Sequence, residues 1–199
     1  MASKLSHFDL ESKFEMPTKV YDVLASHGLY SAIKAAIDLG IFEYLDKNKD
    51  AFSAKNIANH LSLSLDITTA ILDTCVSLDL LTKEIPDGNL EFATYANTTQ
   101  TQHFMLRHSP KSLVPFVEHV SDIHLPLLAH LSSAAKEGCS QWSKAFNRST
   151  EDVYKNLLAN KAELMDFVKG MGSFSAQSVS WLLSAFDLSQ YKQLCDLGG

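Results

Sequence analysis

A helix–turn–helix–hairpin order is the feature that most constrains what this chain can fold into. Apolar residues recur at helical spacing in two neighbouring segments, and two extended pieces joined by a strong turn sequence follow them. In chain order these are a helix at 54–61 capped by Ser53, a turn at 62–64, a helix at 65–81, and extended pieces at 82–85 and 90–94 joined by Pro86-Asp87-Gly88-Asn89. This order is typical of a winged helix, so we expect a winged-helix-like domain with a small β-wing in a mainly α chain.

Winged-helix units often bind DNA, so the charge of the second helix decides between two functions. The segment 62–82 contains no Lys or Arg, whereas Asp66, Asp73 and Asp79 are present. Carboxylates repel phosphates, and the formal net charge of -6 offers a polyanion no electrostatic attraction. We therefore expect no nucleic-acid partner, and a winged-helix regulator remains the weakest alternative.

The composition predicts a protein with a substantial core, since 46% of the 199 residues are hydrophobic. Residues 1–16 lack an apolar core of signal-peptide length, and no segment approaches the roughly 20 apolar residues of a membrane-spanning helix. We therefore expect a cytoplasmic location and no membrane partner. Cys75, Cys139 and Cys195 are scattered along the chain, which predicts reduced, mostly buried thiols.

A long helix is predicted at 20–37, followed by Gly40, which suits a left-handed helix end. Its apolar residues cover more than one side of the helix. The excess apolar surface is contributed by Tyr30, Ile33, Ile37, Ile41 and Phe42. Two interpretations stay open, namely burial against a second subunit and a single, well-buried central helix.

The second half of the chain is predicted to be helical. Apolar residues recur through 113–134 as one helix or as two separated near Pro126, and Gly138 ends this segment. Acidic residues after Thr150 indicate the first turn of another helix. An apolar stripe around residues 164–171 predicts the next helix, and a last helix at about 176–185 leads to a buried strand.

No complete active site is visible in the sequence. His103 and His108, like His119 and His124, are five positions apart, whereas two ligands on one helical face need a spacing of three or four. No serine lies in a nucleophile elbow between a strand and a helix. We therefore predict neither a metal site nor a catalytic residue in this chain.

Two phrases near the C-terminal end are the most informative. FVKGMGSFS spans 167–175, and CDLGG at 195–199 places glycines after a predicted strand, where backbone can approach a cofactor closely. Three further phrases are YSAIKAAIDLGIFEYL at 30–45, CVSLDLL at 75–81 and AAKEG at 134–138, and the chain ends on LSAFDLSQYKQLCDLGG at 183–199. With these phrases the chain resembles the N-terminal part of the S-adenosylmethionine-dependent small-molecule O-methyltransferases, in particular their acetylserotonin (hydroxyindole) branch.

The resemblance implies what the parent enzyme would do and which residues would serve it. It implies S-adenosylmethionine as cofactor, a small aromatic hydroxyl such as that of N-acetylserotonin as acceptor, and a homodimer. Phe167 and Met171 match positions that line the acceptor pocket, with plain helix packing as the alternative. Ser175 matches a polar position near the cofactor's carboxylate, with a helix cap as the alternative. The start of the family's glycine-rich cofactor loop is matched by Asp196, Gly198 and Gly199.

The resemblance also implies an organisation in two domains. The predicted parts are a flexible N-terminus at 1–17, a winged-helix-like dimerisation domain at 18–106, a helical connection with the start of a Rossmann-like α/β domain at 107–190, and a first strand with a truncated glycine-rich loop at 191–199. The family's ribose-binding acidic residue and its His general base have no counterpart within the chain. We expect that the chain alone neither methylates nor binds S-adenosylmethionine tightly. The alternative is a non-catalytic dimerisation protein that pairs with itself or with a full-length methyltransferase.

Overall fold

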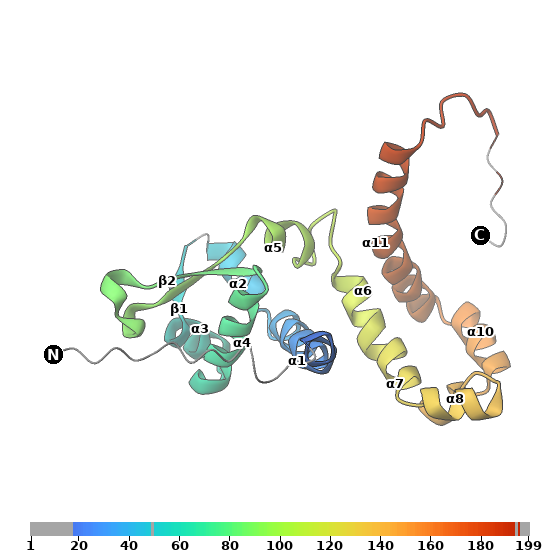
Figure 1. Ribbon diagram of the computed structural model, residues 1–199, viewed down its shortest axis with the longest axis horizontal. Helices are drawn as coiled ribbons and strands as arrows, with labels where there is room; N and C mark the ends of the chain where they lie inside the picture. The colour runs from blue at the N-terminus through green and yellow to red at the C-terminus, as the bar shows by residue number, and fades with distance from the viewer. Residues whose placement is uncertain (1–17, 49, 194, 196–199) are drawn as a thin grey trace, which may run out of the picture.

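The computed structural model describes residues 18–48, 50–193 and 195, and it is mainly helical (Figure 1). The α-helices are α1 Thr18–Asp38, α2 Ile41–Asn48, α3 Ala54–Leu61, α4 Leu65–Ser77, α5 Thr99–Phe104, α6 Val114–His119, α7 Leu125–Leu128, α8 Leu131–Glu137, α9 Trp142–Phe146, α10 Thr150–Ala159 and α11 Lys161–Ala185. The strands are β1 Phe52–Ser53, β2 Leu81–Glu84 and β3 Thr94–Asn97; the 3₁₀ turns are η2 Pro86–Gly88 and η3 Leu90–Phe92, and η4 Val120–His124 is a π-helix. Helices α1 to α5 and the strands form one lobe, and α6 to α11 form an arch beside it in which α11 runs back along α6 (Figure 1).

The strands form one antiparallel sheet in the order β1-β3-β2, with Lys83 of β2 opposite Tyr95 of β3. The predicted hairpin is present, but its second strand lies at Thr94–Asn97 and the prediction of 90–94 is wrong. The reason is local, because the Asn89 side chain accepts a 2.9 Å hydrogen bond from the backbone N–H two residues on and starts the turn η3.

Capping interactions set the helix boundaries of the first lobe. The Ser53 hydroxyl accepts a 3.2 Å hydrogen bond from the Asn56 N–H, so α3 begins where the sequence predicts. Helix α4 ends at Ser77 rather than at 81, because the chain leaves it through Asp79, whose φ of 57° is left-handed. Thr98 caps α5, a helix that the polar composition of this stretch did not predict.

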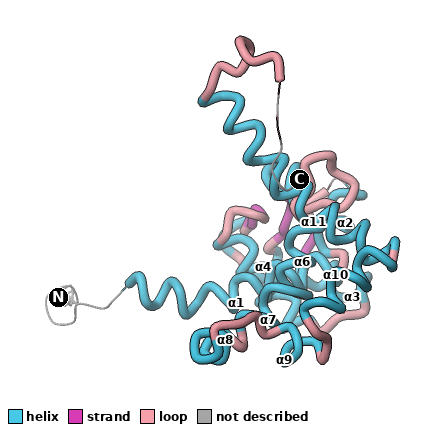
Figure 2. Tube along the Cα trace, turned by 90° about the vertical axis from the view of Figure 1, so that its right-hand side faces the viewer, coloured by secondary structure: helices cyan, strands magenta, loops and turns pink. Residues whose placement is uncertain are grey.

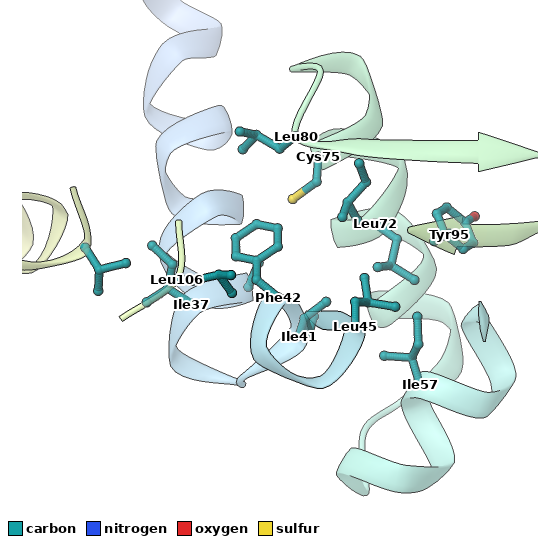
Figure 3. Packing of buried hydrophobic residues seen from close by; sticks show 13 residues of the cluster. Ile37, Ile41, Phe42, Leu45, Ile57, Leu72, Cys75, Leu80, Tyr95 and Leu106 are labelled. Atoms are coloured by element: carbon teal, nitrogen blue, oxygen red, sulfur yellow. The ribbon is translucent and has the colours of Figure 1, made fainter. Parts of the chain in front are cut away.

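An apolar core joins α1, α2, α3 and α4 to the sheet (Figure 3). Its largest fully buried side chains include Tyr95, Phe42, Ile37, Ile41, Ile57 and Leu72. The Tyr95 hydroxyl reaches Asp73 of α4 and donates a 2.8 Å hydrogen bond to its carboxylate. Burial of one such apolar side chain stabilises the folded state by about 1.5–3 kcal/mol, so this cluster is the main source of stability of the first lobe.

The exposed apolar surface of α1 is formed by other residues than the sequence predicted. Ile37, Ile41 and Phe42 are buried inside the chain, so they are not available to a second subunit. The exposed apolar residues lie in the N-terminal half of α1, which extends away from the lobe (Figure 2). They are Val20, Tyr21, Val23 and Leu24.

The arch is helical as predicted, with two corrections. The segment 113–134 is divided into α6, η4, α7 and the start of α8, and not into one or two regular helices. Gly138 ends α8 with a φ of 65°, as predicted. Helix α11 is continuous over Lys161–Ala185, so the expected break before 176 does not exist and the alternative of Ser175 as a helix cap is wrong.

The remaining expectations concern cysteines, the membrane and the chain ends. Cys75 is buried but Cys139 and Cys195 are exposed, so the prediction of mostly buried thiols is wrong. Within the described ranges, no helix combines the length and apolarity that crossing a membrane requires. The segment predicted to be flexible, 1–17, lies outside the described residues, and the described part of the predicted last strand, 191–193 and 195, is not in a strand.

Candidate functional site

An open cavity of about 1010 Å³ lies between the α6–η4–α7 stretch and helices α9, α10 and α11. Its apolar lining consists of Val114, Pro115, Ile123, Leu127, Trp142, Phe146, Val153, Leu157, Phe167 and Met171. Its polar lining consists of Arg107, Glu118, His119, Asp122, His124, Arg148, Glu163, Asp166 and Lys169. Small-molecule sites typically have volumes of roughly 300–1,000 Å³, so the volume of this cavity suits a small ligand and makes it the candidate site.

Two of the predicted site residues come together in this cavity. Phe167 and Met171 are four positions apart on α11, on one helical face, and both line the cavity. Ser175 lies one further turn along α11, exposed and outside the lining. The other predicted cofactor-binding residues, Asp196, Gly198 and Gly199, lie outside the described residues. The binding roles of all these residues stay predictions.

A π-turn shapes the wall that α6 and α7 contribute. The Leu125 N–H donates to the Val120 carbonyl oxygen, five residues earlier rather than four. Pro126 follows at once and has no N–H, so a regular α-helical hydrogen-bond ladder cannot continue through this point. From the first lobe, the Tyr30 hydroxyl donates a 2.6 Å hydrogen bond to the Val117 carbonyl oxygen and so holds the start of this wall.

The π-turn brings His119 and His124 side by side. Their ring centroids are 4.8 Å apart with an interplanar angle of 77°, and both residues line the cavity. In a regular α-helix, residues five positions apart point about 140° away from each other around the axis. The prediction that a spacing of five separates these two imidazoles is therefore wrong, because it assumed regular helix geometry.

Aromatic side chains of α6 and α11 surround the histidine pair. Phe116 and Phe174 stack with centroids 4.7 Å apart and an interplanar angle of 26°. Phe167 meets His119 edge to face at 5.6 Å, and Phe116 meets His124 in the same way at 6.3 Å. These offset and edge-to-face arrangements are the favourable ones for aromatic rings. Of these side chains, Phe167 and the two histidines line the cavity, where their rings suit a planar aromatic ligand.

Helices α6 and α11 pack closely at Gly170, which is buried. A Cβ at this position would lie 3.1 Å from the His119 Cβ and 3.3 Å from the Pro115 carbonyl oxygen. Both distances are shorter than ordinary van der Waals contact, so a side chain would push the helices apart. The glycine thus lets α11 bring Phe167 against His119.

Ion pairs neutralise part of the charged lining. Arg107 pairs with Glu118, and the Arg148 Nη1 lies 3.8 Å from the Glu163 Oε2. The other charged lining residues in the described chain are Asp122, Asp166 and Lys169. The two signs are thus nearly balanced, and the cavity favours a neutral ligand over an anion.

The His119 imidazole is held in its neutral form at neutral pH. Burial lowers its pKa from the ordinary value of 6.5, and the neighbouring His124 lowers it further, while Asp122 acts in the opposite direction. A neutral imidazole carries one N–H donor and one acceptor nitrogen. His119 can therefore donate and accept hydrogen bonds without adding charge to the cavity.

The described residues do not by themselves form a metal or cofactor site. Within these ranges, no group of three or more His, Cys, Asp or Glu side chains is placed to hold a metal ion. Ser175 is the one predicted cofactor-binding residue that the structure describes, and it is exposed on α11. A single exposed hydroxyl does not form a cofactor site.

Two family matches together cover most of the chain. Residues 21–107 match the O-methyltransferase dimerisation domain, and residues 128–199 match the O-methyltransferase domain. The chain belongs to the O-methyltransferase family. The dimerisation match contains α2 to α5 and most of α1, and the second match contains α8 to α11. The lining of the cavity in this O-methyltransferase chain comes from the second match and from the stretch between the matches, with Arg107 at the end of the first match.

Relatives and solved structures place the chain near the acetylserotonin O-methyltransferases. Those of Bos taurus and Gallus gallus are each 32% identical to it, over 83% and 82% of the chain and 47% and 46% of their own lengths. A crystal structure of human N-acetylserotonin methyltransferase in complex with SAM matches with a TM-score of 0.76 at 25% identity, over 89% of this chain and 51% of that one. PigF with SAH, at 22% identity and a TM-score of 0.69, shows the fold alone.

The comparisons confirm the expected family and the mainly helical fold class. The chain spans about half the length of the curated relatives that it matches.

Proposed function

We propose that the whole protein transfers a methyl group from S-adenosylmethionine to the hydroxyl of a small aromatic acceptor, with N-acetylserotonin as the leading candidate. The observation that carries this proposal is the aromatic cavity in a chain of the O-methyltransferase family. The names of the first relatives, acetylserotonin O-methyltransferases, and the SAM complex of the human enzyme support the choice of acceptor and cofactor.

Residue roles follow from the cavity and from the resemblance. Phe167 and Met171 form part of the acceptor's apolar wall, because both line the cavity from α11. Ser175 contributes to the cofactor site, together with the loop that begins at Asp196, Gly198 and Gly199. S-adenosylmethionine supplies the methyl group when bound, and the role of the described residues is to hold the aromatic ring in an apolar setting.

We further infer a homodimer formed through a winged-helix-like domain at 18–106. The family match of 21–107 and the exposed apolar residues of α1 support this inference. The stretches 107–190 and 191–199 then belong to the helical connection and the methyltransferase domain. The free state of Cys75, Cys139 and Cys195 favours a cytoplasmic location, where thiols stay reduced.

Methyl transfer tests the proposal directly. The protein expressed from its complete gene is incubated with N-acetylserotonin and S-adenosylmethionine that carries a radiolabelled methyl group. We expect label in the O-methylated product, and we expect Phe167→Ala and Met171→Ala to raise KM by about fivefold or more, since each removes apolar contact from the acceptor. A stable dimer that labels no aromatic hydroxyl would instead favour the non-catalytic interaction protein.

A further inference from the structure

The two imidazoles on the cavity wall are open to a ligand. Neither His119 nor His124 has a hydrogen-bond partner in the part of the chain that the structure describes, and their ring nitrogens are not among the buried unpartnered polar atoms found there. The ring nitrogens are therefore not fully buried, and both residues line the cavity. The π-turn sets the rings 4.8 Å apart, and π-turns inside helices are frequent at functional sites.

Neighbouring aromatic rings restrict the orientation of the two imidazoles. Phe167 packs at 5.6 Å against His119, and Phe116 at 6.3 Å against His124, so ring–ring contacts restrict both imidazoles. Gly170 backs His119 directly, since a Cβ there would lie 3.1 Å from the His119 Cβ. Held rings with open nitrogens can bind a polar group with little loss of side-chain entropy on binding.

The chemistry of the pair selects the kind of polar group. One neutral imidazole offers an N–H donor and an acceptor nitrogen, so two adjacent imidazoles can offer a donor and an acceptor at once. A secondary amide, with one C=O and one N–H, matches this arrangement. A carboxylate does not, because an ionised carboxylate only accepts hydrogen bonds and offers no N–H donor to the acceptor nitrogen.

We propose that His119 and His124 together bind an uncharged amide substituent of the aromatic acceptor, remote from the methylated hydroxyl, and so select acceptors that carry one. This inference rests on the proposed function, in which the aromatic acceptor occupies the cavity. The pair is a specificity element, and the methyl-transfer chemistry itself does not depend on it.

Calorimetric titration with two ligands of one scaffold tests the proposal. N-acetylserotonin carries the amide, and 5-hydroxyindole has the same ring and hydroxyl without it. The unaltered protein, expressed from its complete gene, should bind N-acetylserotonin about tenfold more tightly than 5-hydroxyindole, as hydrogen bonds of about 1 kcal/mol each allow. His119→Phe and His124→Phe should reduce this preference to twofold or less and leave the affinity for 5-hydroxyindole unchanged. His124→Gln, which keeps a donor and an acceptor, should retain most of it.

Controls separate this inference from the proposed function. His103→Phe, at an exposed histidine outside the cavity lining, should leave both affinities unchanged. Proton NMR of the unaltered chain gives a reading that needs no variant, since the Hε1 signals of two histidines should shift with N-acetylserotonin and not with 5-hydroxyindole. Equal affinity of the unaltered chain for both ligands, or equal losses in the Phe variants, would overturn the histidine role while acceptor binding stands. Failure of both ligands to bind would overturn both.

Discussion

The Tyr30 hydroxyl donates a 2.6 Å hydrogen bond to the Val117 carbonyl oxygen, which lies 87 residues further along the chain. This bond joins the dimerisation part of the chain to the helix that carries the candidate site. Burial raises the pKa of the Tyr30 hydroxyl, with a smaller opposing effect from Ser121, so the hydroxyl stays protonated and able to donate at neutral pH. A change in α1 can therefore reach the cavity wall through one contact.

Removal of this hydroxyl should weaken the junction. Tyr30→Phe keeps the ring and deletes the donor, and we expect the free energy of unfolding to fall by about 0.5–1.5 kcal/mol. The Hε1 signals of His119 and His124 should also move, because the π-turn that places them starts at Val120, whose N–H donates to the Val117 carbonyl oxygen. Urea unfolding and proton NMR measure the two effects. Tyr191→Phe, at an exposed position outside α1, serves as control, and equal effects in both variants would contradict the role of the bond.

A methyl group at Gly170 should separate the two helices that form the aromatic wall. The added Cβ meets the His119 Cβ at 3.1 Å and the Pro115 carbonyl oxygen at 3.3 Å, so Gly170→Ala should destabilise the chain by about 1–3 kcal/mol. Gly172→Ala is the matched control on the same helix. Among the described residues, no atom beyond the backbone of α11 itself lies within 4 Å of its Cβ position, and the higher helix propensity of Ala should stabilise it by up to about 1 kcal/mol. Thermal unfolding that gives both variants the same sign would contradict this packing.

The buried thiol of Cys75 should make stability depend on alkaline pH. Burial raises its pKa from 9.0 to about 11. Because the pKa of the thiol is higher in the folded state than in the unfolded state, the folded chain holds this proton more tightly. The resulting contribution to the free energy of unfolding is fully present below about pH 9 and is lost as the pH rises through 11. The loss attributable to Cys75 should reach about 2 kcal/mol by pH 11.

A comparison of variants isolates this thiol from the lysines and tyrosines that also titrate at alkaline pH. Urea unfolding at pH 8, 9, 10 and 11 should give a gap between the unaltered chain and Cys75→Ala that narrows with rising pH. Cys139→Ala should follow the unaltered chain, since Cys139 is exposed. A constant gap for Cys75→Ala would show that its thiol titrates normally in the folded chain.

Periodicity and capping residues predicted much of the fold, because these signals act locally. Ser53 starts α3 through its own hydroxyl, and Gly40 and Gly138 follow α1 and α8 in the left-handed conformation that a glycine readily adopts. The prediction of a separate last helix at about 176–185 was wrong, because α11 continues through the glycines and serines at 170–175. Contact with α6 supports this stretch, which is weakly helical by itself.

The candidate site was only partly predictable, because its geometry depends on contacts between distant segments. Phe167 and Met171 both line the cavity, since their spacing of four puts them on one helical face, and their role in an acceptor pocket stays a prediction. His119 and His124 were set aside because their spacing is wrong for a regular helix. Pro126 was the available signal, since a proline this close behind a helix disturbs the turn before it, but the resulting π-turn could not be read from spacing alone.

The N-terminal half of α1 should carry the dimer contact. Val23 is 71% exposed and stands among the apolar residues Val20, Tyr21 and Leu24, which a second copy of the chain would cover. Val23→Lys would place a charge in that contact, and sedimentation should show the dimer dissociating at a concentration more than about tenfold higher than the unaltered chain needs. Leu90→Lys is the matched control, because Leu90 is 69% exposed on the hairpin and should leave the dimer intact. If the two variants dissociate alike, or if the unaltered chain sediments as a monomer at micromolar concentration, the dimer does not form through α1.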